Sequence, residues 1–202
     1  MTLQIPGLPP LAWTGAEGAA DIDESAAGSV LTMTSEPGVD WTNDALGGPQ
    51  QQAATALGFV ADGDFALSAR VRVLSERSTF DAGVLAIWAD DDHWAKICFE
   101  FSPQGEPMVV SVVTDVFSDD CNSQLVEGDF VFLRVVRTGD GWAFHSSEDG
   151  RVWRFVRLFR LSSPGPFRVG FLSQAPTGDA CTAAFDEIAY TTTVPSDLRD
   201  GS

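Results

Sequence analysis

Hydrophobic and polar residues alternate along much of the chain with a period of two, which is the period of a β-strand that buries one face. The clearest case is FALSARVRVL at residues 65–74, where apolar side chains occupy every second position and Ser68, Arg70 and Arg72 lie between them. We find no helical periodicity sustained over three turns. The pattern therefore predicts an all-β protein.

Further strands follow at short spacing, separated by turn residues such as Asp62-Gly63 and Asp149-Gly150. The predicted ranges are 82–89, 93–101, 108–115, 130–138, 142–147, 153–159, 167–173 and 180–190. So many aromatic-rich strands cannot cover their apolar faces in one flat sheet, so we prefer a sandwich of two antiparallel sheets to a closed barrel. We expect a single domain over residues 1–202, with its core at about 13–190, the first 28 residues wrapping the outside and 192–202 forming a tail.

The segment DAGVLAIWADDDHWAKICFEF, at 81–101, places polar residues inside an apolar strand. If Ile97 and Phe99 face the core, then Trp94, Lys96 and Glu100 share the opposite face. Pairing this strand with the next through the SPQGEP loop puts Cys98 opposite Ser111 and Lys96 opposite Val113, in an assumed register. Ser111 then joins the polar face.

A second hairpin, around Gly139-Asp140, pairs Arg134 with His145 and turns both away from the core. If the two hairpins belong to one sheet, their polar residues line a shared concave surface with tryptophans as stacking platforms. The candidate ligand-binding residues are Trp41, Trp94, Lys96, Glu100, Ser111, Arg134 and His145, and none is assigned a catalytic role. The alternatives remain open that Lys96 and Glu100 form a solvated ion pair, that Trp94 completes a core and that His145 is a hydrogen-bonded surface residue.

The charge balance argues against two kinds of partner. Lys and Arg total 12 against 29 for Asp and Glu, which gives a net charge of −17. A surface so negative repels nucleic acid and anionic membranes, and otherwise serves solubility. The amino terminus has no basic segment followed by a long apolar run, which argues against a signal peptide or membrane anchor.

The cysteines favour a reduced, cytoplasmic protein. Cys98, Cys121 and Cys181 are odd in number and far apart, without C-x-x-C spacing. The Asp90-Asp91-Asp92 turn lacks the spaced ligands of a calcium loop. We therefore expect no metal site and no cofactor.

Five segments together resemble one known family. They are DAGVLAIWADDDHWAKICFEF, SVVTDVFSDD, FLRVVRTGDGWAFHSSEDGRVW, RVGFLSQAP and FDEIAY, and Trp13 and Asp40-Trp41 fit the same pattern. The chain resembles the family called domain of unknown function 1349, which includes proteins described as regulators of enolase and belongs to the concanavalin A-like lectin and glucanase superfamily. The resemblance implies a jelly-roll-like sandwich whose concave sheet commonly binds carbohydrate, with Trp94, Lys96 and Glu100 as contacts by position.

Three functions from different classes follow. The first is a non-catalytic carbohydrate-binding or sugar-sensing module on the concave sheet. The second is a cytoplasmic regulatory or protein-interaction domain, prompted by the family's link to enolase regulation, with a protein partner or self-association. The third is a glycoside hydrolase, which needs two carboxyl groups. Glu100 supplies one, but no second is evident and the E-x-D-x-x-E signature of glucanases is absent, so a non-enzyme is preferred.

Overall fold

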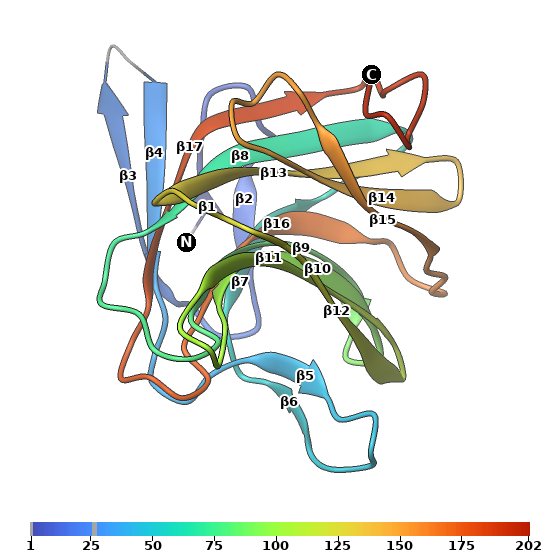
Figure 1. Cartoon of the computed structure of the whole chain (residues 1–202). Helices are drawn as coiled ribbons and strands as arrows, with labels where there is room; N and C mark the ends of the chain where they lie inside the picture. The colour runs from blue at the N-terminus through green and yellow to red at the C-terminus, as the bar shows by residue number, and fades with distance from the viewer. Residues whose placement is uncertain (1, 26–27) are drawn as a thin grey trace.

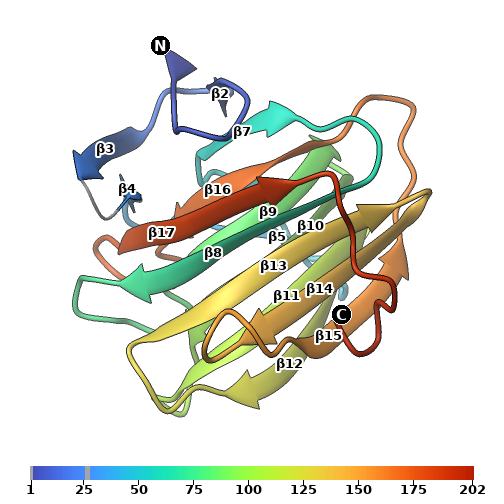
Figure 2. The same cartoon turned by 90° about the horizontal axis from the view of Figure 1, so that it is seen from above.

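The computed structural model describes residues 2–25 and 28–202, so that residues 1, 26 and 27 of the predicted domain lie outside the described part. The described residues form two large antiparallel sheets that pack face to face, with a short hairpin beside them (Figures 1 and 2). The prediction of an all-β sandwich of two antiparallel sheets is confirmed. Within the described residues, no helix is long and apolar enough to cross a membrane.

The strand order shows how the chain alternates between the layers. The eight-stranded sheet runs β1 (Thr2–Leu3), β2 (Leu11–Thr14), β7 (Ala56–Val60), β16 (Arg168–Gln174), β9 (Ala82–Asp90), β10 (His93–Phe101), β11 (Pro107–Asp115) and β12 (Phe117–Leu125). The seven-stranded sheet runs β15 (Arg154–Arg160), β14 (Gly141–Ser147), β13 (Phe130–Thr138), β8 (Phe65–Val73), β17 (Thr182–Thr191), β4 (Gly28–Thr34) and β3 (Ala19–Ser25). The hairpin is β5 (Trp41–Asn43) with β6 (Gln50–Gln52).

The main core lies between the two sheets. Alternation turns Leu67 of β8 and Ile97 of β10 inward, and both are fully buried. Phe171 of β16 and Phe185 of β17 meet across the core with ring centroids 5.1 Å apart in an edge-to-face arrangement. Because each such side chain contributes about 1.5–3 kcal/mol on burial, this layer holds the sheets together.

The strands predicted by range are all present, with small shifts at their ends, but three regions differ from the prediction: the amino-terminal segment, strand β12 and the carboxy-terminal segment. The first 28 residues do not simply wrap the outside, because their described part contains β1 and β2 of one sheet and β3 of the other. The edge strand β12, FSDDCNSQL, was missed because its side chains are mostly exposed and polar, so that it carries no apolar alternation.

The predicted tail, 192–202, is in fact packed on the outer face of the seven-stranded sheet. Val194 and Leu198 lie against a small apolar cluster of Ala66, Val136 and Ala143. These residues come from β8, β13 and β14, so the segment crosses neighbouring strands and covers their outward side. The prediction of a tail is wrong because Val194 and Leu198 bind this segment to the sheet through apolar contacts.

The eight-stranded sheet curves, and its outer face is concave. In Figure 1, β9 to β12 arch over the β5–β6 hairpin, which lies below them. A second apolar cluster lies on this concave side and includes Trp41, Trp88, Trp94 and Leu172. The outer face of this sheet is therefore partly filled by the hairpin.

Candidate ligand-binding site

The concave face is organised in rungs across four strands. Lys96 of β10 is in register with Ala86 of β9 and Val112 of β11, and Val112 is in register with Asp120 of β12. Ala86 and Val112 are short, which leaves room between them for the long lysine side chain. Lys96 and Glu100 line one pocket on this face, as the alternation along β10 predicts.

Lys96 is buried and fully hydrogen-bonded. Its Nζ donates to Asp40 Oδ1 at 2.7 Å, to the Trp41 carbonyl at 2.7 Å and to Gln174 Oε1 at 2.8 Å. Burial by itself would lower the pKa of Lys96, but the surrounding groups, with the Asp40 carboxylate first among them, together raise that pKa above its ordinary value. Since an ammonium has three N–H donors, Lys96 has none left for a ligand. Its ion-pair partner is Asp40, and not Glu100 as the solvated-pair alternative supposed.

Trp41 and Trp94 are packed against each other and do not form exposed platforms. Trp94 is fully buried and Trp41 is 4% exposed. The Trp41 ring lies edge-on to both Trp88 and Trp94, with centroids 5.6 Å and 5.7 Å apart, and its Nε1 donates to the Ala54 carbonyl at 2.7 Å. The predicted stacking role of the two rings is wrong because Trp41 occupies the space that a ligand would need.

Ser111 is not on the concave face, because the β10–β11 register differs from the predicted one by one residue. Ser111 pairs with Ile97, and Lys96 pairs with Val112. The loop is shorter than assumed, since the Ser102 amide donates to the Glu106 carbonyl at 2.9 Å and closes the turn. Ser111 is therefore fully buried on the side of Ile97, and its Oγ has no partner among the described residues.

Arg134 and His145 pair as predicted, but on the other sheet. Their register is confirmed, and β13 and β14 belong to the seven-stranded sheet. The carboxy-terminal segment covers both: an Arg134 guanidinium N–H donates to the Gly201 carbonyl at 2.8 Å, and His145 Nε2 lies 2.7 Å from the Leu198 carbonyl. Burial lowers the pKa of Arg134 to about 10 and that of His145 to about 4. The predicted surface shared with Lys96 is wrong, because local pattern does not determine which sheet a hairpin joins.

The pocket on the concave face has a volume of about 230 Å³, and its lining is polar and apolar in about equal parts. Its lining residues come from β5 and the residue before it, from β10, β11, β12 and β16, and from the β8–β9 loop. They are Asp40, Trp41, Thr42, Phe80, Lys96, Glu100, Val110, Val112, Asp120, Asn122 and Gln174. The sequence prediction named only Trp41, Lys96 and Glu100 among them.

Glu100 is the exceptional group in this pocket. Only 8% of the residue is exposed, and no described residue donates a hydrogen bond to its carboxylate. Burial raises the pKa of Glu100 to about 7, with Lys96 opposing the rise and Asp40 adding to it. Partial desolvation at the pocket wall raises the pKa of Asp120 as well. The carboxylate oxygens are not fully enclosed, so this largely desolvated acceptor opens on the pocket, as groups with raised pKa do at many functional sites.

Replacing Glu100 by Gln is expected to stabilise the protein at high pH. The folded state holds the Glu100 proton more tightly than the unfolded chain, so this residue's contribution to stability is fully present below pH 4.5 and is lost as the pH rises through about 7. The gain from Glu100→Gln should therefore be about 3 kcal/mol larger at pH 8 than at pH 4.5. Urea denaturation of both proteins at the two pH values measures this, and an equal difference at both would contradict it.

Phe80 is an aromatic residue of the pocket that the sequence prediction missed. It lies in the β8–β9 loop, is 37% exposed and has a φ of 70°. A bulky residue in this left-handed region is strained and is held there by its neighbours. The Phe80 amide donates to the Phe101 carbonyl at 2.7 Å, and Gln174 Nε2 donates to the Phe80 carbonyl at 3.0 Å. These two bonds fix the backbone that presents the ring at the pocket.

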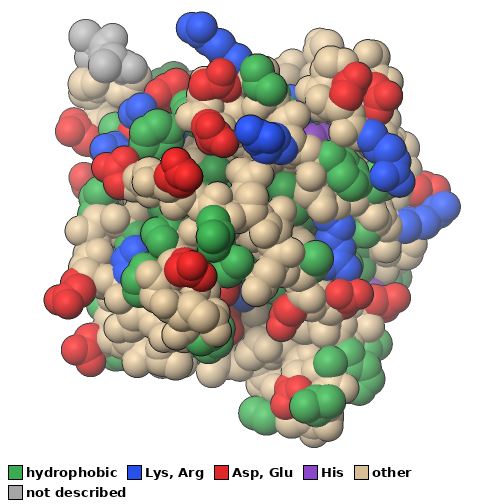
Figure 3. Space-filling view, in the orientation of Figure 1, with side chains coloured by type: hydrophobic (Ala, Val, Ile, Leu, Met, Phe, Trp, Pro, Cys, Tyr) green, Lys and Arg blue, Asp and Glu red, His purple; other side chains and the backbone are tan. Residues whose placement is uncertain are grey.

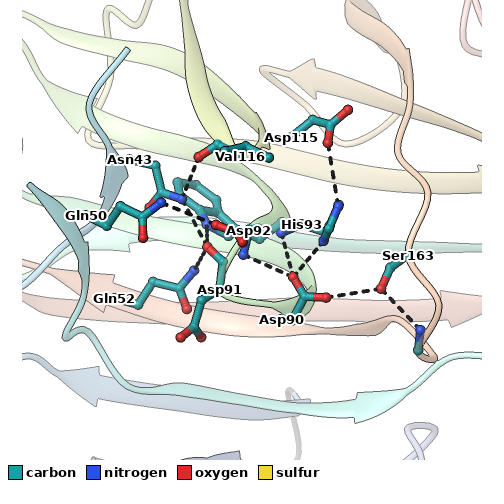
Figure 4. Close-up of polar contacts among 12 residues, drawn as sticks. Asn43, Gln50, Gln52, Asp90, Asp91, Asp92, His93, Asp115, Val116 and Ser163 are labelled. Atoms are coloured by element: carbon teal, nitrogen blue, oxygen red, sulfur yellow. Dashed lines mark hydrogen bonds and ion pairs between the residues drawn. The ribbon is translucent and has the colours of Figure 1, made fainter. Parts of the chain in front are cut away.

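The β5–β6 hairpin is anchored at the other end of the concave face (Figure 4). The Asp91 carbonyl, in the β9–β10 turn, accepts hydrogen bonds from Asn43 Nδ2 at 3.0 Å, Gln52 Nε2 at 2.8 Å and Trp94 Nε1 at 3.2 Å. Asn43 also donates to the Val116 carbonyl at 3.0 Å. The acidic turn thus holds the hairpin that carries Trp41, with backbone rather than carboxylate oxygen as the main acceptor.

The fold and the pocket define a class: a jelly-roll-like β-sandwich with a polar pocket on its concave sheet. The chain belongs to the family described as "Protein of unknown function (DUF1349)", whose match covers residues 20–193. This confirms the family resemblance found in the sequence. A search of curated proteins finds no match.

Solved structures with the same fold come from several organisms. A functionally unknown protein from Saccharomyces cerevisiae has a TM-score of 0.79 at 23% identity, over 92% of this chain and 97% of that one. A GH43 protein from Bacillus licheniformis has a TM-score of 0.63 at 12% identity, and the match covers 81% of this chain but 33% of the GH43 chain. An alginate lyase from Klebsiella pneumoniae has a TM-score of 0.55 at 14% identity, over 84% of this chain and 83% of that one. At these identities the similarity shows a shared fold.

Proposed function

We propose that the concave pocket binds a carbohydrate without catalysis. The observation that carries the proposal is the Glu100 carboxylate, which is buried at the pocket and lacks a hydrogen-bond donor among the described residues. Sugar hydroxyls are donors that a pocket carboxylate accepts, and such a bond would compensate the cost of burying Glu100. The pocket is therefore suited to a ligand rich in hydroxyl groups.

The size of the pocket limits the ligand. A volume of about 230 Å³ lies below the range of roughly 300–1,000 Å³ that is typical of sites for drug-sized molecules. The expected ligand is one sugar ring, free or at the end of a longer chain. A long polysaccharide groove would need more length than this pocket has.

The remaining lining residues supply the other contacts of a sugar site. Asp120 and Asn122 of β12 are exposed and have free polar atoms toward the pocket. The Phe80 ring supplies an apolar surface for the C–H face of a sugar. Structures of similar fold include an enzyme called xylan beta-1,4-xylosidase and one called alginate lyase, whose names refer to polysaccharides. That support is analogy from fold.

A glycoside hydrolase is the second candidate, favoured by one observation. Glu100 has a pKa raised to about 7, which suits a general acid, and Asp120 brings a second carboxyl group to the same pocket. Release of reducing sugar from a panel of aryl glycosides, abolished by Glu100→Gln, would replace the first proposal by this one. Binding without turnover supports the non-catalytic function.

Replacing Phe80 by Gly separates binding from folding. Gly accepts a φ of 70° without strain, and this gain offsets the lost burial of the ring and the greater freedom of the unfolded chain, so the free energy of unfolding should change by less than about 1 kcal/mol. Loss of the ring should weaken the binding of neutral monosaccharides by about fivefold or more. Calorimetric titration of glucose, xylose, galactose and mannose into both proteins measures the change. Sugars that bind equally well to the variant would remove Phe80 from the site, and no heat from any sugar at millimolar concentration would contradict the proposed function.

A further inference from the structure

The pocket carries more negative than positive charge. Asp40, Glu100 and Asp120 line it, whereas Lys96 is its one cation among the described lining residues. Lys96 is already paired with Asp40, with their side chains 3% and 17% exposed. Glu100 and Asp120 have cations in their neighbourhood but no ion-pair partner among the described residues, in a protein whose net charge is −17. Figure 3 shows acidic side chains spread widely over the visible face.

The other cation near Glu100 is engaged elsewhere. The Arg77 guanidinium donates to the Phe99 carbonyl at 2.9 Å and to the Asp81 carbonyl at 3.3 Å, and it lies over the Phe99 ring at 4.4 Å from the centroid. It lowers the pKa of Glu100 less than Lys96 does. Neither Lys96 nor Arg77 hydrogen-bonds the Glu100 carboxylate.

On this basis we infer that the group recognised at Glu100 is an ammonium, so that the ligand class is amino sugars. This inference rests on the proposed function and specifies its ligand. A hydroxyl group would supply a hydrogen bond to the Glu100 carboxylate but would leave its charge uncompensated. An ammonium supplies both a hydrogen bond and the opposite charge, and the attraction between opposite charges adds to the hydrogen bond near a poorly solvated carboxylate. Asp120, exposed on β12 two strands away, lines the same pocket and adds a second negative charge to it.

A divalent metal ion fits the same charges less well. Ca²⁺ takes about six to eight oxygen ligands, and the pocket offers two unpaired carboxylates beside an Asp40 oxygen already bonded to Lys96. The test nevertheless includes Ca²⁺ as a competitor, because a bound Ca²⁺ would neutralise the negative charge of the same two carboxylates.

The test compares sugars that differ in one group. Glucose, N-acetylglucosamine, glucosamine and 6-amino-6-deoxyglucose are titrated into the full chain by calorimetry at pH 5.5, 7 and 8. At pH 8 we expect the better of the two amino sugars to bind about tenfold more tightly than glucose or N-acetylglucosamine. For 6-amino-6-deoxyglucose, whose amine stays charged, the affinity should rise from pH 5.5 to 8 because Glu100 loses its proton over this range. The charged groups that face Glu100 are Asp40, Asp120, Lys96 and Arg77.

Two variants with the same change in net charge are compared: Glu100→Gln tests the inference, and Glu24→Gln is its matched control. Glu100→Gln should narrow the gap between amino-sugar and glucose affinity from about tenfold to less than about threefold, because the charge that favours an ammonium is lost. Glu24→Gln, at an exposed position on β3 of the other sheet, should leave the amino-sugar affinity unchanged. Equal affinity for all four sugars would overturn the inference. So would displacement of the amino sugar by millimolar CaCl₂ to the same extent as by a simple amine. Either result would leave the proposed function standing. Binding of none of the sugars would overturn both.

Discussion

Replacing Lys96 by Met should lower the free energy of unfolding by about 3–5 kcal/mol, because a buried ion pair loses one partner. The methionine keeps most of the apolar volume of lysine and removes the ammonium. It leaves the Asp40 carboxylate, the Trp41 carbonyl and Gln174 Oε1 without the donor they share. Denaturant unfolding followed by circular dichroism measures the loss.

An exposed ion pair is the matched control for this substitution. Arg154 and Glu148 lie 3.4 Å apart with side chains 61% and 76% exposed. Arg154→Ala should cost less than about 1 kcal/mol, since water screens the pair. If Lys96→Met cost no more than Arg154→Ala, the buried network would not be what holds Asp40 and Trp41 on the concave face.

Replacing Trp41 by Ala should also destabilise the protein by about 3–5 kcal/mol, the usual cost of truncating a large buried aromatic residue. The ring fills the space between Trp88 and Trp94, and its Nε1 satisfies the Ala54 carbonyl. A large loss of stability is the signature of a structural residue. A ligand platform would instead show weakened binding with little change in the free energy of unfolding.

Leu46, in the loop of the β5–β6 hairpin that carries Trp41, provides the control for the Trp41 substitution. Its side chain is 95% exposed, so Leu46→Ala should change the free energy of unfolding by less than about 0.5 kcal/mol. Thermal denaturation of the two variants beside the parent protein measures both effects. A Trp41→Ala variant as stable as Leu46→Ala would contradict the burial of the ring, and would restore Trp41 as a candidate platform.

The sequence predicted the faces of individual strands well and the contacts between strands less well. Alternation along β10 put Lys96 and Glu100 on one face because side-chain direction depends only on position along a strand. The register to β11 depends on how the 102–106 loop closes, and one residue of difference moved Ser111 to the other side of the sheet. Arg134 and His145 were paired correctly for the same local reason, but the sheet they joined was a long-range choice.

Most of the pocket was beyond sequence reasoning because its residues come from distant segments. The partner of Lys96 is Asp40, 56 residues away, and Gln174 is 78 residues away. Asp120 lies on an edge strand with no apolar pattern, and Phe80 lies in a loop. One signal was available: a lysine and a glutamate inside an apolar strand need partners wherever the chain folds. That signal identified the strand, but it could not identify the partners.

The carboxyl ¹³C resonance of Glu100 reports most directly on whether a ligand binds in the Glu100 pocket. The measurement follows this resonance at pH 8 while neutral and amino monosaccharides are added to the parent protein and to Phe80→Gly. We predict a change that saturates with ligand in the parent protein and that needs a higher ligand concentration in the variant. A Glu100 resonance that stays unchanged at millimolar concentrations of every sugar would contradict a ligand site in this pocket.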